Sequence, residues 1–227
     1  DGQWLSFDAN YGGDRDLYIM PLGGTAEDAI LLVDRPGDDC YPAWSPDGTQ
    51  IAFMGEADGD REIYIINIDG TGLTRLTDSP LEDYEPEWSP DGTQLVFTSR
   101  RASNSDIYIM DADGGNVQLL AQGFGLDWRP AWSPDGEWIA FESWRDGDAE
   151  DYLIRPGGSD LTQLTSNEAE DGHPTWSPDG SQIAFHSNRG GWYELYVMDV
   201  DDPENVSLIQ SQSLRNLLPN WRPDVGN

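Results

Sequence analysis

The stretch AWSPDGTQIAF, residues 43–53, joins a tryptophan to a short polar turn and then to an apolar run. Close copies return along the chain as EWSPDGTQLVF, AWSPDGEWIAF and TWSPDGSQIAF. The tryptophans of the four copies are Trp44, Trp88, Trp132 and Trp176, and a looser copy, NWRPDVG, contains Trp221. A motif that recurs every 44 or 45 residues indicates an array of structural repeats.

Each repeat can be divided into four short strands. Within S-P-D-G, proline fixes φ, aspartate bonds to nearby backbone and glycine accepts a positive φ, so the motif predicts a tight turn. The apolar run after the turn, Ile51-Ala52-Phe53 in the first copy, is expected to form a strand buried on both faces. The third strand carries a tyrosine and reads DLYIM, EIYII, DIYIM, EDYLI and ELYVM in the five repeats. A Gly- or Asp-rich turn then leads to a short fourth strand, such as Leu73–Thr77 or Leu161–Thr165.

Four antiparallel strands per repeat, with no helical periodicity, predict an all-β fold in which each repeat is one blade of a β-propeller. The chain begins just after the first strand of a repeat and ends with an extra first strand, Leu217–Trp221. We therefore expect a single domain of five four-stranded blades, in which the C-terminal strand completes the first blade and hides two sheet edges. A fragment of a larger array is the alternative. The repeat units are approximately 1–46, 47–90, 91–134, 135–178 and 179–227.

The repeat resembles the TolB-type, WD-like propeller repeat, whose mark is P-x-W-S-P-D-G followed by I-A-F and [DE]-I-Y-x-M. The resemblance covers essentially the whole chain, although the copy at Trp221 has lost its serine and the fourth repeat reads EDYLI. It implies that the WSPDG strand is innermost and lines a central channel. The TolB family is usually six-bladed, so five blades depart from it. Periplasmic TolB and protease-associated propellers share the repeat, which therefore implies architecture rather than chemistry.

The charge of the chain narrows the choice of partners. The sequence has 43 acidic residues against 12 arginines and no lysine, for a formal net charge of −31. Such a surface repels phosphate backbones, so nucleic acid is not an expected partner. No apolar run approaches the length of about 18 residues that a membrane span needs, and we expect no membrane insertion. We expect a monomeric periplasmic or extracellular protein, although the single Cys40 neither requires nor excludes an oxidising compartment.

Comparison of the five repeats with one another separates architecture from candidate function. Two positions vary most: the third residue before each tryptophan, and the residue directly after the phenylalanine of the second strand. Antiparallel pairing places the two sets opposite each other at the end of the channel away from the S-P-D-G turns, where propellers commonly hold ligands. The expected pairs are Tyr41 with Met54, Glu85 with Thr98, Arg129 with Glu142, His173 with His186, and Leu218 with Asp8.

A ligand at this channel mouth is expected to contact some of these varied side chains. Trp144 joins them, because an exposed indole offers a stacking platform for sugars or peptides. The candidate ligand-binding residues are Asp8, Tyr41, Glu85, Arg129, Glu142, Trp144, His173 and His186.

Several of these residues also have purely structural explanations. Arg129 and Glu142 form either a structural ion pair or a site in which the arginine binds a ligand carboxylate. His173 and His186, next to Asp171, are similar to a metal site, but spacing fixes no third strong ligand, so they are better explained as two surface-loop histidines. A repeated residue five positions before each tryptophan is expected to cap a loop rather than to form a ring of ligands. It is Asp39, Asp83, Asp127, Asp171 and Asn216.

Two acidic clusters are the candidates for a metal ion. Alternate spacing places their carboxylates on one side of a strand, and such oxygen ligands suit calcium, which is the one cofactor that the sequence suggests. In the alternative, the acid before each tyrosine of the third strand pairs with arginines of the preceding loop, Arg100 or Arg101, Arg145 and Arg189. The cluster residues are Asp58, Asp60 and Glu62 in one repeat and Asp146, Asp148 and Glu150 in another.

No nucleophile motif, Cys/His pair or metal-binding helix motif is present, and the inner strands offer no clear pair of catalytic carboxylates. We therefore expect a non-enzymatic binding or protein-interaction module that takes a protein, peptide or small ligand at the channel mouth. One alternative is an accessory or sensor propeller domain of a larger hydrolase, kinase or envelope complex. Another is a glycoside-processing enzyme.

Overall fold

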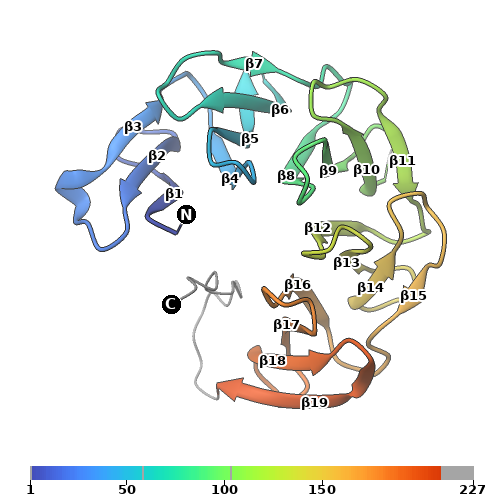
Figure 1. Cartoon of the computed structure of the whole chain (residues 1–227). Coiled ribbons are helices and arrows are strands. Elements are labelled where there is room, and N and C mark those ends of the chain that lie inside the picture. The colour runs from blue at the N-terminus through green and yellow to red at the C-terminus, as the bar shows by residue number, and fades with distance from the viewer. Residues whose placement is uncertain (1, 58, 103, 211–227) are drawn as a thin grey trace. The chain divides into compact units, whose positions relative to one another are not determined.

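A computed structural model of the chain describes residues 2–57, 59–102 and 104–210. These residues form two compact units. The first holds the described residues up to 102 together with Ile109–Gln118, and the second holds Asn104–Tyr108 and the described residues from 119 onward. The strands belong to five antiparallel sheets, which confirms the prediction of an all-β repeat fold (Figure 1). One short 3-10 helix, η1 (Ala26–Asp28), is present, and no helix of the described residues is long and apolar enough to cross a membrane.

The strands of each sheet follow one another in chain order. The first sheet contains β1 (Trp4–Ala9), β2 (Asp16–Pro21) and β3 (Ile30–Val33). The second contains β4 (Asp39–Trp44), β5 (Gln50–Ala57), β6 (Asp60–Asn67) and β7 (Thr74–Arg75). The third contains β8 (Asp83–Trp88), β9 (Gln94–Ser99), β10 (Asp106–Asp111) and β11 (Gln118–Ala121). The fourth contains β12 (Asp127–Trp132), β13 (Ile139–Ser143), β14 (Glu150–Ile154) and β15 (Thr162–Gln163). The fifth contains β16 (Asp171–Trp176), β17 (Gln182–Ser187), β18 (Glu194–Asp199) and β19 (Asp202–Gln210).

The number of strands per sheet agrees with the prediction in four of the five sheets. The first has three, with β1 at its edge. The strand expected to complete it, Leu217–Trp221, lies outside the described residues, so closure by this strand stays a prediction. The predicted fourth strands are present but short: β7 and β15 each contain two residues.

The S-P-D-G segment forms the predicted turn. Asp47 Oδ1 accepts hydrogen bonds from Ser45 Oγ at 2.6 Å and from the Thr49 backbone N–H at 3.0 Å, and Ser45 Oγ accepts from the Gln50 backbone N–H at 2.9 Å. Gly48 has a φ of +71°, a conformation that glycine adopts without steric cost. Hydrogen bonds to the aspartate also recur in the turns at Asp91, Asp135 and Asp179.

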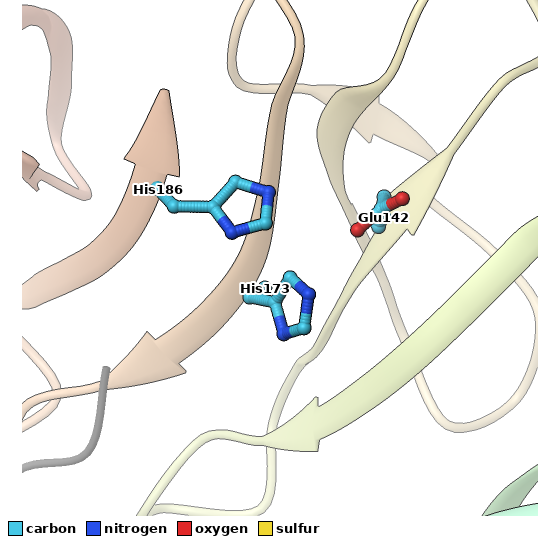
Figure 2. A group of neighbouring side chains, drawn as sticks. All are labelled: Glu142, His173 and His186. Atoms are coloured by element: carbon cyan, nitrogen blue, oxygen red, sulfur yellow. The ribbon is translucent and has the colours of Figure 1, made fainter. Parts of the chain in front are cut away.

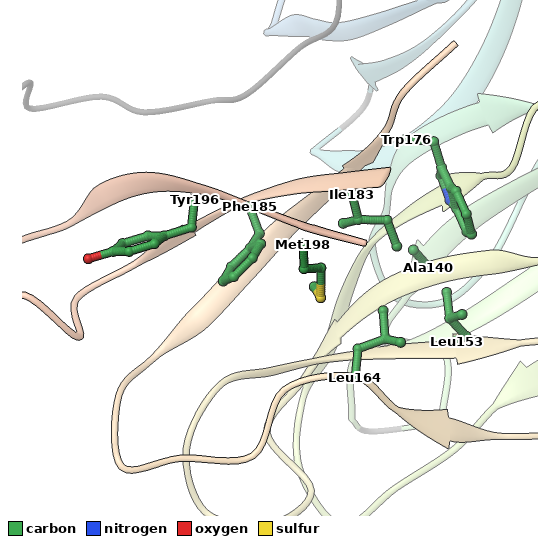
Figure 3. Packing of buried hydrophobic residues seen from close by; sticks show 8 residues of the cluster. All are labelled: Ala140, Leu153, Leu164, Trp176, Ile183, Phe185, Tyr196 and Met198. Carbon is green, nitrogen blue, oxygen red and sulfur yellow. The ribbon is translucent and has the colours of Figure 1, made fainter. Parts of the chain in front are cut away.

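The core lies between neighbouring blades as well as within them. In the second unit, β13 and β14 contact β16, and side chains of the fourth and fifth blades share one hydrophobic cluster (Figure 3). Phe185 stacks on Tyr196, its partner across β17 and β18, at 6.0 Å between ring centroids. Trp176 Nε1 donates a 3.0 Å hydrogen bond to the carbonyl of Ala131 in the preceding blade. The repeated tryptophan therefore joins this blade to its neighbour.

Candidate functional site

The strands β4, β8, β12 and β16, each the first strand of its sheet, share a β-bulge near the middle of the strand. In β12, for example, Trp128 pairs with Glu142 and Ala131 with Ala140, so the regular pairing is interrupted between them. In all four strands the bulge contains a residue with positive φ that is not glycine and that is followed by proline. The left-handed region is uncommon for such residues, and bulges redirect side chains. The four residues are Tyr41 (φ 56°), Glu85 (φ 52°), Arg129 (φ 54°) and His173 (φ 56°).

These are four of the varied positions, and the bulge shifts their backbone pairing by one residue from the expected register. The residue before each one is the Cα partner of the residue after the second-strand phenylalanine. Three of the expected side-chain contacts are nevertheless present. Thr98 Oγ1 lies 3.3 Å from Glu85 Oε2, and Arg129 Nη1 lies 2.8 Å from Glu142 Oε2. The ring centroids of His173 and His186 are 4.3 Å apart.

Three candidate residues belong to the first unit. Asp8 lies 3.6 Å from Arg15 Nη1, and the same arginine atom lies 3.9 Å from Cys40 Sγ. Tyr41 is exposed, whereas Glu85 is half-buried. Leu218, the expected partner of Asp8, lies outside the described residues.

The other five candidates belong to the second unit and are linked through Glu142. The buried carboxylate accepts hydrogen bonds from Arg129 Nη1 at Oε2 (2.8 Å) and from Trp144 Nε1 at Oε1 (3.0 Å). Both imidazole rings lie beside it: one potential ligand atom each of Glu142, His173 and His186 lie within 4.8 Å of one another (Figure 2). Among the described residues this is the one group of three or more His, Cys, Asp or Glu side chains so closely placed. We call Arg129, Glu142, Trp144, His173 and His186 the Glu142 cluster.

Two expectations about this cluster were wrong. Trp144 is half-buried and bonded to Glu142, so it is not the exposed platform that the sequence suggested. Asp171 was expected beside the histidines, but it is fully buried and accepts hydrogen bonds from Arg189 Nη2 and Asn167 Nδ2, both at 2.7 Å. The carboxylate that accompanies the two histidines is therefore Glu142.

Burial determines the charge of one imidazole. Desolvation lowers the pKa of His173 to about 2, and the positive charge of Arg129 and the neighbouring His186 add to this effect. His173 is consequently neutral at ordinary pH. A neutral imidazole can accept a hydrogen bond or bind a metal ion through its unprotonated nitrogen.

Two residues that are important to the cluster were not identified from the sequence. Gly172 precedes His173, and a Cβ atom at this position would lie 2.3 Å from Glu142 Oε2. Asp151 is the Cα partner of Glu142 across β13 and β14; it is fully buried, and neither carboxylate oxygen has a hydrogen-bond partner among the described residues. Burial raises the pKa of Asp151 well above its usual value, and the nearby negative charges of Glu142 and Asp171 add to this.

The comparison between repeats contained the signal for both residues. Gly172 stands where the other bulges have larger side chains, and Asp151 stands where the other third strands have aliphatic ones. The equivalents of Gly172 are Cys40, Tyr84 and Trp128, and those of Asp151 are Leu17, Ile63, Ile107 and Leu195.

The repeated aspartates five residues before the tryptophans are structural, but not as predicted. They are buried at the start of the first strands of their sheets, where their carboxylates form ion pairs with arginines, for example Asp83 with Arg101 at 2.7 Å. The prediction that these arginines pair with the acid before the tyrosine was also wrong. Arg145 and Arg189 bind Asp127 and Asp171. Asn216 lies outside the described residues.

The second blade forms the same ion pair by a different route. Its aspartate, Asp39, pairs with Arg35, which precedes the first strand of the sheet rather than following the second one. The position that is serine in the next three blades is Gly55 here, and a Cβ atom on it would lie 2.1 Å from Arg35 Nη2. Glycine is therefore required because the arginine side chain passes through this space.

The acidic clusters considered for calcium are largely engaged in other contacts. Glu62 Oε1 accepts hydrogen bonds from Arg75 Nη2 and the Ser79 backbone N–H, both at 2.8 Å. Asp146 accepts from the Tyr152 hydroxyl, and Glu150 Oε1 accepts from the Asn167 backbone N–H at 2.8 Å. Asp60 is exposed, Asp148 is half-buried, and Asp58 lies outside the described residues. Calcium binding here stays a prediction.

Comparison with known proteins agrees with the repeat and the fold. The family model of the TolB beta propeller domain matches residues 1–125 and 118–227. A search of the curated proteins found no match. Among solved structures, TolB from Acinetobacter baumannii has a TM-score of 0.79 and 23% identity, over 93% of this chain and 54% of that one. A putative TolB from Agrobacterium tumefaciens has a TM-score of 0.80 and 29% identity, over 92% and 79%.

The fold is also similar to part of a larger protein. A puromycin-hydrolyzing peptidase of Mycobacterium tuberculosis has a TM-score of 0.73 and 18% identity, over 92% of this chain and 37% of that one. The chain therefore spans about half of the Acinetobacter TolB and about a third of the peptidase.

Proposed function

Because the chain belongs to the TolB β-propeller family, we propose that it is a non-enzymatic binding module whose ligand contacts the side chains that differ between blades. The observation that carries this proposal is the left-handed conformation at Tyr41, Glu85, Arg129 and His173. Such a conformation costs an L-residue about 1–2 kcal/mol, and glycine would avoid the cost. If the four bulges had only a structural role, glycine would suffice at each of them. Four side chains of different chemistry, held at this cost, support a role in recognition.

The Glu142 cluster is the best defined part of the proposed binding surface. It combines a guanidinium, a carboxylate, an indole and two imidazoles, a set that can orient a small ligand or a peptide through several polar contacts. Arg129 suits an acidic group of the ligand, because its planar guanidinium can bind a carboxylate through two parallel hydrogen bonds.

A second candidate function is that of an accessory domain in a larger protein. The similarity to about a third of a peptidase chain favours it, although at 18% identity this similarity concerns the fold alone. In this alternative the varied bulge residues would contact the partner domain rather than a free ligand.

We also propose that the five sheets close into a monomeric propeller through the C-terminal segment, with the varied residues around the mouth of its channel. The first sheet supports this, because it has one strand fewer than the others and β1 lies at its edge. We propose a periplasmic or extracellular location, for which the formal charge of −31 is the support.

The binding proposal can be tested by a thermal-shift screen of peptides, sugars and small acids against protein treated with EDTA, because a ligand of the folded state raises the Tm. For a ligand found in this way, Arg129→Ala should weaken binding by at least about 1 kcal/mol, or roughly five-fold in Kd. Arg100→Ala is the control, since Arg100 forms an exposed ion pair with Glu82. Ligands that bind equally well to wild type and to all Glu142-cluster variants would contradict the site.

A further inference from the structure

We infer that Glu142, His173 and His186 form a binding site for a divalent transition-metal ion of the zinc type. The inference deepens the proposed function and rests on it, because it assigns a ligand class to the same Glu142 cluster. The three side chains come from β13, β16 and β17, and β13 contacts β16 across the two blades (Figure 2). Strands fix the backbones of all three, as a preorganised site requires.

The distances fit a site that closes around an ion by small side-chain rotations. One potential ligand atom each of Glu142, His173 and His186 lie within 4.8 Å of one another. In a tetrahedral zinc site with bonds of about 2.0–2.1 Å, ligand atoms are about 3.3 Å apart. Each atom therefore needs to move by only about 1 Å. Three protein ligands leave the fourth position open for water or for a donor atom of a bound molecule.

The donor set selects the class of metal. Two imidazole nitrogens and one carboxylate oxygen suit zinc and its neighbours in the first transition row, whereas calcium and magnesium prefer oxygen ligands alone.

Asp151 provides an independent observation. Its side chain is fully buried, and neither oxygen has a hydrogen-bond partner among the described residues. As the direct partner of Glu142, it projects from the same face of the sheet. A buried carboxylate of this kind is costly, and the positive charge of Arg189 offsets only part of the burial and of the negative charges of Glu142 and Asp171. A divalent ion bound at Glu142 supplies further positive charge, and this explains an aspartate where the other blades have leucine or isoleucine.

Arg129 is the positive partner of Glu142 in this structure and competes with the metal. Its Nη1 lies 2.8 Å from Oε2, the oxygen that Gly172 leaves accessible. The arginine is partly exposed, so it can turn outward when an ion binds. Removing its charge should therefore strengthen metal binding.

The test is a calorimetric titration of EDTA-stripped, dialysed protein with zinc chloride. The buffer contains sodium chloride and excess magnesium chloride, so that these cations rather than zinc occupy the many surface carboxylates. One saturable site is expected. Glu142→Gln, His173→Gln and His186→Gln should each weaken the Kd by at least about ten-fold, whereas Arg129→Gln should strengthen it. Glu137→Gln, which removes an exposed carboxylate outside the Glu142 cluster, should leave the Kd unchanged.

A second measurement needs no variant. The chain has two histidines, so imidazole NMR signals report this site alone. Zinc should shift both sets of signals with a stoichiometry of one, and cobalt(II) should show the visible absorption of a four-coordinate site. Absence of saturable zinc binding, or binding that leaves both histidines unchanged, would overturn the inference.

These outcomes are distinct from failure of the proposed function. An organic ligand that binds the EDTA-treated protein through Arg129, without any zinc site, would overturn the metal inference and support the binding module. A zinc site that depends on both histidines would support the metal inference even if the ligand screen contradicted the binding module.

Discussion

Glu142 and Asp151 are direct partners across β13 and β14, so two carboxylates project from the same face of one sheet in a buried environment. In the metal-free protein this pair is destabilising, because Asp151 has no hydrogen-bond partner among the described residues. Asp151→Leu introduces the residue type of the other blades and should stabilise the metal-free protein by about 1–3 kcal/mol in urea unfolding. The same variant should bind zinc several-fold more weakly.

Ile107→Leu, at the equivalent position in the third blade, is the control and should change the stability little. If Asp151→Leu unfolds at lower urea concentrations than wild type, the carboxylate has a stabilising contact that the proposed site does not explain.

The bulge residues should show the cost of their backbone conformation. At Tyr41, with φ of 56°, both glycine and alanine remove the side chain, so the difference between the two variants isolates the backbone. Tyr41→Gly should be more stable than Tyr41→Ala by about 1 kcal/mol in chemical denaturation. At Ala43, in the regular part of β4, glycine should instead be less stable than alanine. Equal stability of the two Tyr41 variants would contradict the cost on which the binding proposal rests.

The buried ion pairs should matter much more than the exposed ones. Arg145 Nη2 lies 3.2 Å from Asp127, which is fully buried, and the guanidinium also stacks over Tyr152 at 4.6 Å. Arg145→Met leaves this carboxylate unpaired and should cost about 3–5 kcal/mol at pH 8. Arg155→Met removes a pair whose carboxylate, on Glu137, is exposed to solvent, and should cost less than about 1 kcal/mol. Similar losses for both variants would mean that burial does not determine the strength of these pairs.

Stability should pass through a maximum at about pH 4. Burial raises the pKa of Asp83 from 3.8 to about 6, so the folded state binds more protons than the unfolded state in this range, and stability falls as the pH rises through it. Hydrogen bonds from Ser177 and Ser181 lower the pKa of Asp179 to about 2, which adds stability that is lost as the pH falls from about 4 to 2. Urea unfolding at constant ionic strength measures both limbs. Asp83→Asn should flatten the limb above pH 4, and a steady rise in stability from pH 4 to pH 8 would contradict the assignment.

The proposed closure predicts that the fold depends on its C-terminal segment. Deletion of residues 211–227 should leave β1 as an unpaired edge and cause aggregation or loss of a single cooperative unfolding transition. Deletion of residues 224–227, which follow the expected strand, is the control and should have little effect. Calorimetry and light scattering check both variants, and a truncated protein that melts like the full chain would contradict closure.

The repeat made the strands, the turns and the main side-chain contacts predictable from sequence. Arg129 meets Glu142 and His173 meets His186, as the alignment of blades suggested. The bulges were not predictable, because a residue before proline ordinarily prefers an extended conformation and nothing in the local sequence indicates a positive φ. The partner of each arginine was not predictable either. Near the arginine, two acids repeat from blade to blade: one lies five residues before the tryptophan and the other lies before the tyrosine of the third strand. Packing alone selects the first of these as the partner of Arg189, and it is Asp171.

At the bulges, the path of the backbone does not depend on which side chain is present. Tyrosine, glutamate, arginine and histidine all adopt nearly the same φ at this position, so the chain accepts interchangeable residues there without altering the surrounding pleat. Each of these four blades thus offers one variable position on a constant framework, and a combinatorial library randomised at the four positions should acquire new specificities while the scaffold remains the same.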